Sequence, residues 1–388
     1  MPFPSFRPFR KKTNWLAALA AEAAAPLLHA CAVVETGPST DPRRWRKALI
    51  IGDNHIGDLL YRSASLGQLK AGFPDCEFHY LAAPGASDIL EGNPSLASIL
   101  PWLRSDSPLD LAPDRFDALK AMHFDAALCT NCIKYWPELV LAVRLGIANR
   151  VAYTYKGFSG WATLPIPIHY PQPWPVYFRD YVAALTGQEP DWPARPVIYA
   201  NESDEGLADA VWGKVDRQKP VTACFLTSRQ PTRMWPAAKF GETLRALQRS
   251  CDTHIVLCGA AGDAEVLGGV NTDFGLNADI LAGSLGIRAL SCFLRRCAVV
   301  LSTDSGPRHT ANAAGVPVVF VRNVWSNAVE TGVYLDTETD LCAMPHDGDR
   351  GDGAALLAAI DPEKAADILA AILSQSSIPN GLHRTTTG

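Results

Sequence analysis

One stretch of the sequence, residues 301–320 (LSTDSGPRHTANAAGVPVVF), constrains the fold more than any other. It reads as the end of an apolar strand, a tight turn at residues 302–306, an alanine-rich helix and a second apolar strand. Serine, threonine and aspartate before a helix can cap its N–H groups, and Pro307 fits the first helical turn. Gly306 lets a ligand approach the backbone closely. A strand–turn–helix–strand unit is typical of a parallel sheet covered by helices.

The start of this helix is suited to bind phosphate. Unpaired N–H groups and the positive end of the helix dipole both attract an anion at such a place. An ordinary capped turn between a strand and a helix contains the same residue types, so this segment alone leaves both interpretations open.

A second strand-to-helix turn lies near the start of the globular region. Residues 48–51 (ALII) predict a short apolar strand, and GDNHIGD follows, before a helix that begins at Leu59. The spacing of Gly52 and Gly57 does not match the GxGxxG fingerprint of dinucleotide-binding proteins. Asp58 at the helix start is stabilised as a carboxylate and can accept a proton from a substrate. The alternative is that Asp58 only caps its helix.

Composition narrows the class of protein. The 388 residues, 48% of them hydrophobic, are enough for two or three domains. A net charge of −5 gives no reason to expect a nucleic-acid partner. The ten cysteines are scattered through apolar segments, which favours free thiols in a reducing compartment. Cys129 and Cys132 form a lone CxxC without a second pair, so two cysteines flanking a strand end are a simpler interpretation than a zinc or redox site.

The first 46 residues read as an extension and linker. Aromatic and basic residues alternate over residues 3–12, and an alanine-rich run follows. Glu22 and Pro26 interrupt this run, which therefore fits neither a signal peptide nor a transmembrane helix. Two interpretations remain: a partly helical extension packed on the protein, or an interfacial segment whose residues 1–20 touch an anionic membrane.

Beyond the linker, apolar strands alternate with helical patterns, which predicts two doubly wound α/β domains. The predicted strands lie at residues 48–51, 77–82, 126–129, 150–152, 221–226, 254–258, 280–281, 298–301 and 318–321. The predicted helices lie at residues 59–71, 86–93, 136–145, 237–249, 264–269, 287–295, 308–314 and 361–375. Both turns described above follow strands, at the edge of the sheet where such folds bind ligands.

The domain boundaries follow from composition. We expect one domain at residues 47–200 and a second at residues 201–360, followed by a C-terminal helix and disordered tail at residues 361–388. Residues 155–175 are rich in proline, glycine and aromatic side chains, and are expected to form a long irregular segment with a functional or interfacial role.

With these motifs in place, the sequence resembles glycosyltransferase family 9, the family of the lipopolysaccharide heptosyltransferases, over residues 47–333. Residues 304–319 match the motif D-[ST]-G-x-x-H-x-A-x-A-x-G-x-P-V-V throughout. The G-D pair in IIGDNHIGDLL and the W-P pair in FLTSRQPTRMWPAAKF also agree with the family. The resemblance implies the GT-B fold, two Rossmann-like domains facing a central cleft. It places the acceptor in the N-terminal domain and the nucleotide sugar in the C-terminal domain.

The resemblance also implies an inverting transfer of a sugar from a nucleotide-diphosphate donor to a hydroxyl of a cell-surface glycan or lipid-linked acceptor. Asp58 matches the general base of the family, in a first-turn loop with Asn54, His55 and Gly57. The residues expected to bind the donor are Thr227, Ser228, Arg233, Asp304, Ser305, Gly306 and His309. Arg233 stands where the family usually has lysine, and it keeps the positive charge for the departing diphosphate. Neither a metal nor a cofactor is expected.

Some features leave the details open. ADP-heptose is the best-known donor of the family, but residues 320–325 replace its usual FG-x-T run, so the donor is not fixed. His309 can contact substrate or be a packed helix residue. Arg322 can contact substrate or lie on the surface. Asp263 can bind ribose or begin a solvated helix. A non-catalytic nucleotide- or glycan-binding protein and a nucleotide-sugar epimerase are the alternative functions. A transferase of this kind is expected in the cytoplasm, at the inner face of the membrane.

Overall fold

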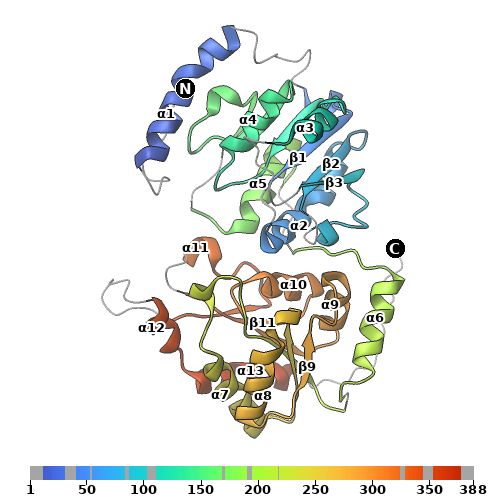
Figure 1. Cartoon of the computed structure of the whole chain (residues 1–388), viewed down its shortest axis with the longest axis vertical. Helices are drawn as coiled ribbons and strands as arrows, with labels where there is room; N and C mark the ends of the chain where they lie inside the picture. The colour runs from blue at the N-terminus through green and yellow to red at the C-terminus, as the bar shows by residue number, and fades with distance from the viewer. Residues whose placement is uncertain are drawn as a thin grey trace. The chain divides into compact units, whose positions relative to one another are not determined.

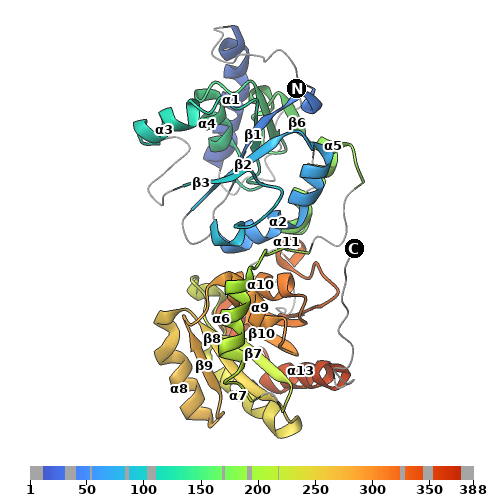
Figure 2. The same cartoon turned by 90° about the vertical axis from the view of Figure 1, so that its right-hand side faces the viewer.

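The computed structural model describes residues 12–30, 41–52, 55–83, 87–102, 111–167, 171–189, 195–216, 218–323, 328–343 and 353–376. The chain divides into two compact units, Met1–Tyr199 (unit 1) and Ala200–Gly388 (unit 2) (Figures 1 and 2). Each unit contains a six-stranded parallel sheet with helices packed against it. The predicted pair of Rossmann-like, doubly wound domains is therefore confirmed.

The sheet of unit 1 has the strand order β3-β2-β1-β4-β5-β6. Its strands are β1 (Lys47–Ile51), β2 (Glu77–Ala82), β3 (Ser98–Pro101), β4 (Ala126–Cys129), β5 (Asn149–Tyr153) and β6 (Leu164–Ile166). Every residue of the central strands β4 and β5 is buried. Continuous burial is what a parallel sheet covered on both faces requires, and it explains why β4 is a short apolar run. Strand β5 buries Asn149 and Arg150 as well, and both donate to backbone carbonyls.

Helices cover both faces of this sheet. They are α2 (Ile56–Gly72), α3 (Pro113–Lys120), α4 (Trp136–Arg144) and α5 (Trp174–Thr186). One face packs an apolar core that includes Leu49 of β1, Leu119 of α3 and Leu141 of α4. Helices α2 and α5 pack against each other. Their approach requires Gly72, because a Cβ atom there would come within 2.4 Å of the Thr186 side chain.

Two sequence predictions for unit 1 need correction. The helix expected over residues 86–93 is wrong, since the described part of this stretch forms only the short 3₁₀ turn η2 (Ser87–Ile89). Gly92 has a φ of +76°, and Pro94 disfavours helical backbone at the residue before it. The irregular segment at residues 155–175 also contains the 3₁₀ turn η3 (Ser159–Trp161) and strand β6. Because β6 lies at the edge of the sheet, Pro165 is tolerated there.

Helix α1 (Lys12–Ala30) precedes the sheet and packs on η3. The Glu22 carboxylate accepts hydrogen bonds from the Ser159 hydroxyl (3.1 Å) and the Gly160 N–H (3.2 Å), and Trp161 Nε1 donates to the carbonyl of Ala21 (3.1 Å). The extension is thus helical and packed on the protein, as the first of the two interpretations predicts. Residues 1–11 lie outside the described part of the chain. Within the described residues, no helix is long and apolar enough to cross a membrane.

The sheet of unit 2 has the order β12-β11-β10-β7-β8-β9. Its strands are β7 (Val221–Phe225), β8 (His254–Gly259), β9 (Asp279–Ala282), β10 (Val299–Thr303), β11 (Val318–Val321) and β12 (Glu338–Leu341). Its helices are α6 (Glu202–Trp212), α7 (Ala237–Ser250), α8 (Ala264–Phe274), α9 (Ile287–Leu294), α10 (Gly306–Ala314), α11 (Ala328–Thr331), α12 (Gly353–Ala358) and α13 (Pro362–Ser376).

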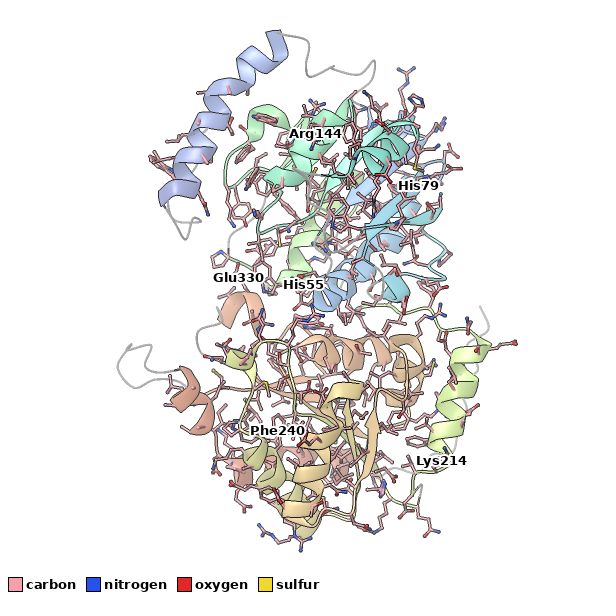
Figure 3. All side chains as sticks on the ribbon, in the orientation of Figure 1. His55, His79, Arg144, Lys214, Phe240 and Glu330 are labelled. Atoms are coloured by element: carbon pink, nitrogen blue, oxygen red, sulfur yellow. The ribbon has the colours of Figure 1, made fainter. Side chains whose placement is uncertain are left out.

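Alternate residues of β7 point into two separate cores. Cys224 packs with α7, α8 and α13, whereas Ala223 and Phe225 pack with α6, α9 and α10. Phe240 of α7 is fully buried in the first of these cores (Figure 3). Helices thus cover both faces of the sheet. Because β7 and β10 are neighbouring parallel strands, their carboxyl ends lie side by side. The predicted C-terminal helix is α13, and the tail at residues 377–388 lies outside the described residues.

Candidate functional site

The turn between β10 and α10 leaves the start of the helix without a side-chain cap. Ser305 is the N-cap residue and has extended backbone, and the helix begins with Gly306 and Pro307. The Ser305 side chain does not cap the helix, contrary to the sequence-based expectation. Its hydroxyl lies 2.8 Å from Thr303 Oγ1 instead. Pro307 has no N–H, and the N–H of Arg308 donates to the carbonyl of Ser305 (3.1 Å). An anion at this helix start would therefore meet the N–H of Gly306 and the positive end of the helix dipole.

The neighbouring strand β7 brings two more of the predicted donor-binding residues to this turn. Thr303 Oγ1 donates to the carbonyl of Thr227 (3.3 Å), and Arg233 Nη1 donates to the carbonyl of Asp304 (3.1 Å). The guanidinium of Arg233 thus lies beside the open helix start. Ser228 takes a local role, since its Oγ accepts from the N–H of Gln230 (3.3 Å).

Asp263 holds the β7 and β8 ends together. Its Oδ2 accepts from the Thr227 hydroxyl (2.9 Å) and from the N–H of Ala260 (2.7 Å). A Cβ atom at Gly259 would come within 2.8 Å of the same Oδ2, so the strand must end in glycine there. Asp263 is therefore engaged with the protein on this oxygen, and it orients the Thr227 side chain.

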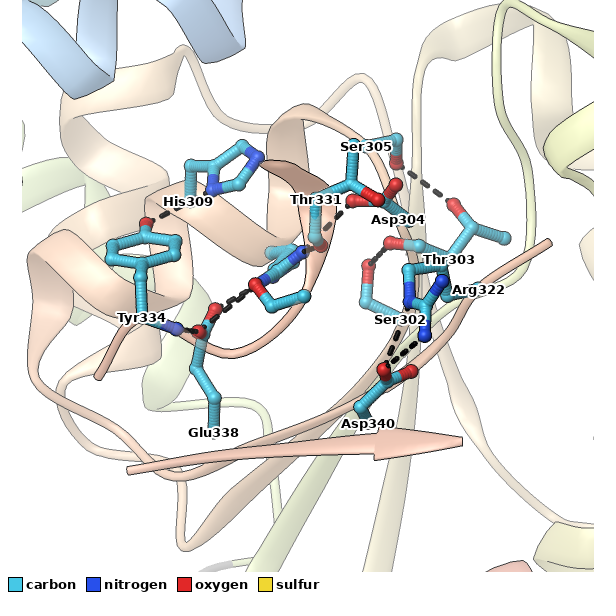
Figure 4. Close-up of polar contacts among 12 residues, drawn as sticks. Ser302, Thr303, Asp304, Ser305, His309, Arg322, Thr331, Tyr334, Glu338 and Asp340 are labelled. Carbon is cyan, nitrogen blue, oxygen red and sulfur yellow. Dashed lines mark hydrogen bonds and ion pairs between the residues drawn. The ribbon is translucent and has the colours of Figure 1, made fainter. Parts of the chain in front are cut away.

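A buried arginine of α10 pairs with Asp304 and Glu338, both of which Figure 4 labels. Arg308, 1% exposed, donates to both oxygens of Glu338 (2.6 and 2.9 Å) and to Asp304 Oδ1 (3.0 Å). It also donates to the carbonyls of Thr331 and Gly332, both at 2.7 Å. A guanidinium with this many directed partners has one orientation. It fixes Asp304 relative to the segment that follows α11.

Asp304 is itself 4% exposed. One carboxylate oxygen, Oδ1, is taken by Arg308, whereas Oδ2 is buried and has no hydrogen-bond partner among the described residues. Buried polar atoms are nearly always hydrogen-bonded, so this oxygen is suited to accept from a hydroxyl of a bound ligand.

His309 is also buried, with 3% of its surface exposed. Its Nδ1 lies 3.0 Å from the hydroxyl of Tyr334, which in turn accepts from Asn312 Nδ2 (2.7 Å). Burial, followed by the positive charges of Arg308 and Arg233, lowers the pKa of His309 well below its usual value. The imidazole is therefore neutral at physiological pH. His309 is thus buried and hydrogen-bonded within unit 2, and it lies within the electrostatic reach of Arg233.

In unit 1, Asp58 is the third residue of α2 and is half-buried. His55, which precedes the helix as its N-cap residue, is exposed and makes no side-chain capping bond (Figure 3). Gly57 lies in the first helical turn, half-buried. The predicted loop residue Asn54 lies outside the described part of the chain.

The sequence analysis missed Arg62, four residues after Asp58 on α2. Arg62 is 5% exposed, and its Nη2 donates to the carbonyl of Thr130 (3.3 Å). A Cβ atom at Gly52, which follows β1, would come within 2.5 Å of Thr130 Oγ1 and 2.9 Å of the guanidinium carbon, so glycine lets both side chains pack against the strand end. Burial acts to lower the pKa of Arg62, but the opposing effect of Tyr80, Asp58 and Glu138 leaves it above its usual value. A permanent positive charge therefore interacts with Asp58.

Several aromatic residues surround this pair. Asp58 and Arg62 line a narrow hollow whose wall includes the side chains of Tyr61, Tyr153, Trp174, Tyr177 and Phe178. The last three belong to α5, which begins at the end of the segment rich in proline and aromatic residues. Part of that segment thus supplies the surroundings of Asp58.

The cysteines in the described part of the chain form no site of their own. Within the described residues, the nine cysteines are free thiols, and no group of three or more His, Cys, Asp or Glu side chains could hold a metal ion. Burial raises the pKa of the Cys129 thiol well above its usual value, so the thiol is protonated and unreactive. The simpler interpretation of the CxxC pair is therefore supported.

Arg322, expected on the surface or in contact with substrate, is buried and donates to Asp340 (2.8 Å).

Comparison with known proteins adds to this geometry. The family model described as glycosyltransferase family 9 (heptosyltransferase) matches residues 117–342, which is more than half of the chain. The chain belongs to glycosyltransferase family 9. It is therefore a glycosyltransferase, as the sequence motifs predict. The matched residues include the whole of the β10–α10 turn, whereas Asp58 precedes them.

Comparisons with individual proteins agree with this family assignment. Lipopolysaccharide heptosyltransferase 2 of Escherichia coli K12 is 21% identical over 289 residues, which cover 70% of this chain and 81% of the relative. The glycosyl transferase family 9 structure from Veillonella parvula has a TM-score of 0.72 at 16% identity, covering 85% of this chain and 98% of that one. The E. coli ADP-heptose LPS heptosyltransferase II has a TM-score of 0.66 at 18% identity, with 85% and 99% covered. These structures confirm the predicted GT-B type of fold.

Proposed function

We propose that this glycosyltransferase moves a sugar from a nucleoside-diphosphate donor to a hydroxyl of a glycan or lipid-linked acceptor, with inversion at the anomeric carbon. The donor class is supported by the names of its relatives, an ADP-heptose LPS heptosyltransferase and a heptosyltransferase solved with ADP. A heptose carried on ADP is the donor we propose to test first. The relatives' acceptor, a lipopolysaccharide, supports a glycolipid or surface glycan as the acceptor class.

The β10–α10 turn of unit 2 is the observation on which the donor site depends. The uncapped start of α10 and the guanidinium of Arg233 offer N–H groups and positive charge at one place. Both stabilise the negative charge that grows on the diphosphate as the sugar leaves. Asp304 Oδ2 accepts from a hydroxyl of the sugar or ribose, which gives the site a means of orienting the donor.

In the proposed reaction, Asp58 removes the proton of the acceptor hydroxyl. The oxygen then bonds to the anomeric carbon as the bond from that carbon to the diphosphate oxygen breaks, and the proton stays on Asp58. A general base must be ionised before the reaction, and the buried positive charge of Arg62 favours that state. The uncapped helix start and Arg233 supply the positive field for the leaving group, so no step requires a metal ion.

Replacement of Asp58 by asparagine tests the assignment. We expect kcat to fall by about 10²- to 10⁴-fold, the usual contribution of a general base, with an unchanged donor Kd. A screen of thermal stability against ADP-, GDP-, UDP- and dTDP-sugars would first identify the donor, since a ligand that binds the folded state raises Tm. Asp114→Asn is a matched control, because Asp114 is an exposed first-turn aspartate of another helix in unit 1.

The same assay separates the alternative functions. A transferase consumes the donor only when an acceptor is present, an epimerase converts it without one, and a binding protein does neither. Loss of donor binding in Asp58→Asn, or full activity in that variant, would remove Asp58 from its assigned role.

We also propose a cytoplasmic enzyme that meets a lipid-linked acceptor at the inner membrane face, with residues 1–20 as a peripheral contact. The basic and aromatic residues among the first twelve support an attraction to anionic lipid. Sedimentation with phosphatidylglycerol vesicles, compared with phosphatidylcholine vesicles and with a variant in which Arg7, Arg10 and Lys11 are replaced by glutamine, tests this contact. Equal binding to both vesicle types would contradict it.

A further inference from the structure

A chain of buried hydrogen bonds leads from Glu338 to His309 (Figure 4). Glu338 Oε1 accepts from Asn312 Nδ2 (2.7 Å), and the same amide nitrogen donates to the Tyr334 hydroxyl (2.7 Å). The Tyr334 hydroxyl lies 3.0 Å from His309 Nδ1. Glu338, Asn312, Tyr334 and His309 are all at most 7% exposed. The chain begins at a carboxylate and ends at an imidazole in the donor-side unit.

The carboxylate sets the direction of every bond along this chain. Glu338 also accepts from Arg308 and from the N–H of Tyr334, so it acts as an acceptor throughout. Asn312 must therefore present its NH₂ group to Glu338, and its second hydrogen goes to Tyr334. Since burial raises the pKa of Tyr334, the phenol keeps its own hydrogen, and the complementary acceptor for that hydrogen is His309 Nδ1.

The charges around His309 exclude the doubly protonated ring. Arg308 on its own helix and Arg233 on η4 (Pro231–Arg233) are both cations that act on it. The acids of the neighbourhood, Asp304 and Glu338, both pair with Arg308 rather than with His309. A neutral imidazole that accepts at Nδ1 carries its hydrogen on Nε2, where it can only donate.

We propose that the Glu338–Asn312–Tyr334 chain is a positioning device that holds His309 as a neutral imidazole protonated at Nε2. In this state His309 meets the nucleoside-diphosphate donor as a hydrogen-bond donor to an oxygen and takes no part in removing the acceptor proton. The role at the donor depends on the proposed function, whereas the protonation state of the ring does not. Asn312 and Tyr334 act through His309 and are positioning residues.

The state of the ring can be measured without any substrate. Long-range ¹H–¹⁵N spectra of protein labelled with ¹⁵N-histidine distinguish protonated from unprotonated ring nitrogens, and His309→Gln identifies the signal among the nine histidines. We expect Nδ1 to be unprotonated and Nε2 protonated, with no change between pH 8 and pH 5.5. Protonation at Nδ1, or on both nitrogens at pH 7, would overturn the proposal.

Removal of one hydroxyl tests the positioning role. In Tyr334→Phe, His309 loses the donor to Nδ1, and we expect a mixture of the two neutral forms together with about tenfold weaker binding of ADP, GDP or UDP, whichever the wild type binds tightest. If the protonation of the His309 ring nitrogens is unchanged in this variant, Tyr334 does not position His309. If the protonation of the ring changes but the nucleotide affinity does not, His309 does not belong to the donor site. The assignment of Asp58 as the general base would remain.

Two further variants separate positioning from a general loss of stability. Tyr153→Phe removes another buried tyrosine hydroxyl, which donates to the carbonyl of Tyr177 in unit 1 (3.0 Å), and it should leave the His309 signals unchanged. Asn312→Ala interrupts the chain one residue earlier, so it provides a second test if Tyr334→Phe fails to fold. We expect a smaller change at His309 in Asn312→Ala, because the Tyr334 hydroxyl remains, and no change there would contradict the chain.

Discussion

Helix α2 in unit 1 and helix α10 in unit 2 each follow a central strand and carry an arginine four residues after an aspartate. Arg308 and Asp304 are both buried and directly paired, and Arg308 also holds Glu338 and two carbonyl groups. Arg62 is equally buried, but Asp58 beside it is only half-buried. The same spacing thus produces a buried carboxylate held by an arginine in one unit. In the other unit the carboxylate is half-exposed, which the proposed proton transfer from substrate requires.

The largest expected difference between the two arginines is in stability. Arg308→Met leaves Glu338 and Asp304 buried without their cation, so we expect the free energy of unfolding of unit 2 to fall by about 3–5 kcal/mol. Urea unfolding followed by circular dichroism measures the loss. Arg249→Met, which removes an exposed pair with Glu363, should cost less than about 1 kcal/mol. A similar small loss in both variants would contradict the structural role of Arg308.

The next effect concerns Arg233, whose guanidinium lies at the surface of the same turn rather than under it. Arg233→Ala should weaken binding of the donor diphosphate by about 10- to 100-fold, the range for one hydrogen bond to a charged group. Stability should change little, since Arg233 is only half-buried and donates to a backbone carbonyl, that of Asp304. Isothermal titration with the nucleoside diphosphate provides the affinity. An unchanged Kd would exclude Arg233 from the donor site.

The role of Arg62 should appear in the pH dependence of the reaction. Its positive charge favours the ionised form of a nearby carboxylate, so Arg62→Met should move the acid limb of kcat/KM to higher pH by about one unit. At a pH on that limb, activity then falls about tenfold, with recovery at higher pH. Arg62→Lys keeps the charge and should move the limb less. Arg249→Met, which removes an exposed arginine paired with Glu363, is the comparison, and the acid limb of this variant should not move.

The smallest effect concerns one buried histidine in each unit. Burial lowers the pKa of both His309 and His79, so each stays neutral in the folded state at a pH where the unfolded imidazole becomes protonated. The unfolded state then binds more protons, and stability falls as pH decreases below about 6.5, by up to about 1.4 kcal/mol per pH unit for each histidine.

His309→Gln should therefore reduce the difference in unfolding free energy between pH 7.5 and pH 5.5. His79→Gln should reduce it less, because His79 lies beside Glu77, whose charge acts in the opposite direction. Urea unfolding at the two pH values measures both changes. An equal pH dependence in the wild type and in His309→Gln would contradict the neutral, buried state of His309.

The central part of each sheet could be predicted from sequence because a parallel strand buried on both faces must be a continuous apolar run. The strands that were missed, β3, β6 and β12, all lie at sheet edges, where polar residues and proline are tolerated. Strand β12 has the sequence ETDL, which no apolar pattern identifies. Its Glu338 is nevertheless buried because Arg308, thirty residues earlier, neutralises it.

The same limit applies to the candidate site. The residues of the β10–α10 turn were predictable because they are contiguous and form a motif. The spacing of four residues between Asp58 and Arg62, and between Asp304 and Arg308, was also visible in the sequence, although only the first pair lies within one helix. The partners that distinguish the two pairs, Glu338 and Thr130, come from distant segments that only the folded topology brings near.

The attachment of α1 has a practical consequence for producing and modifying this enzyme. A single carboxylate, that of Glu22, satisfies the hydroxyl of Ser159 and the N–H of Gly160 in η3, on the unit proposed to bind the acceptor. Trimming the chain ahead of the first sheet would strip η3 of these partners and expose the Trp161 indole. Shortened versions of the enzyme should therefore keep α1.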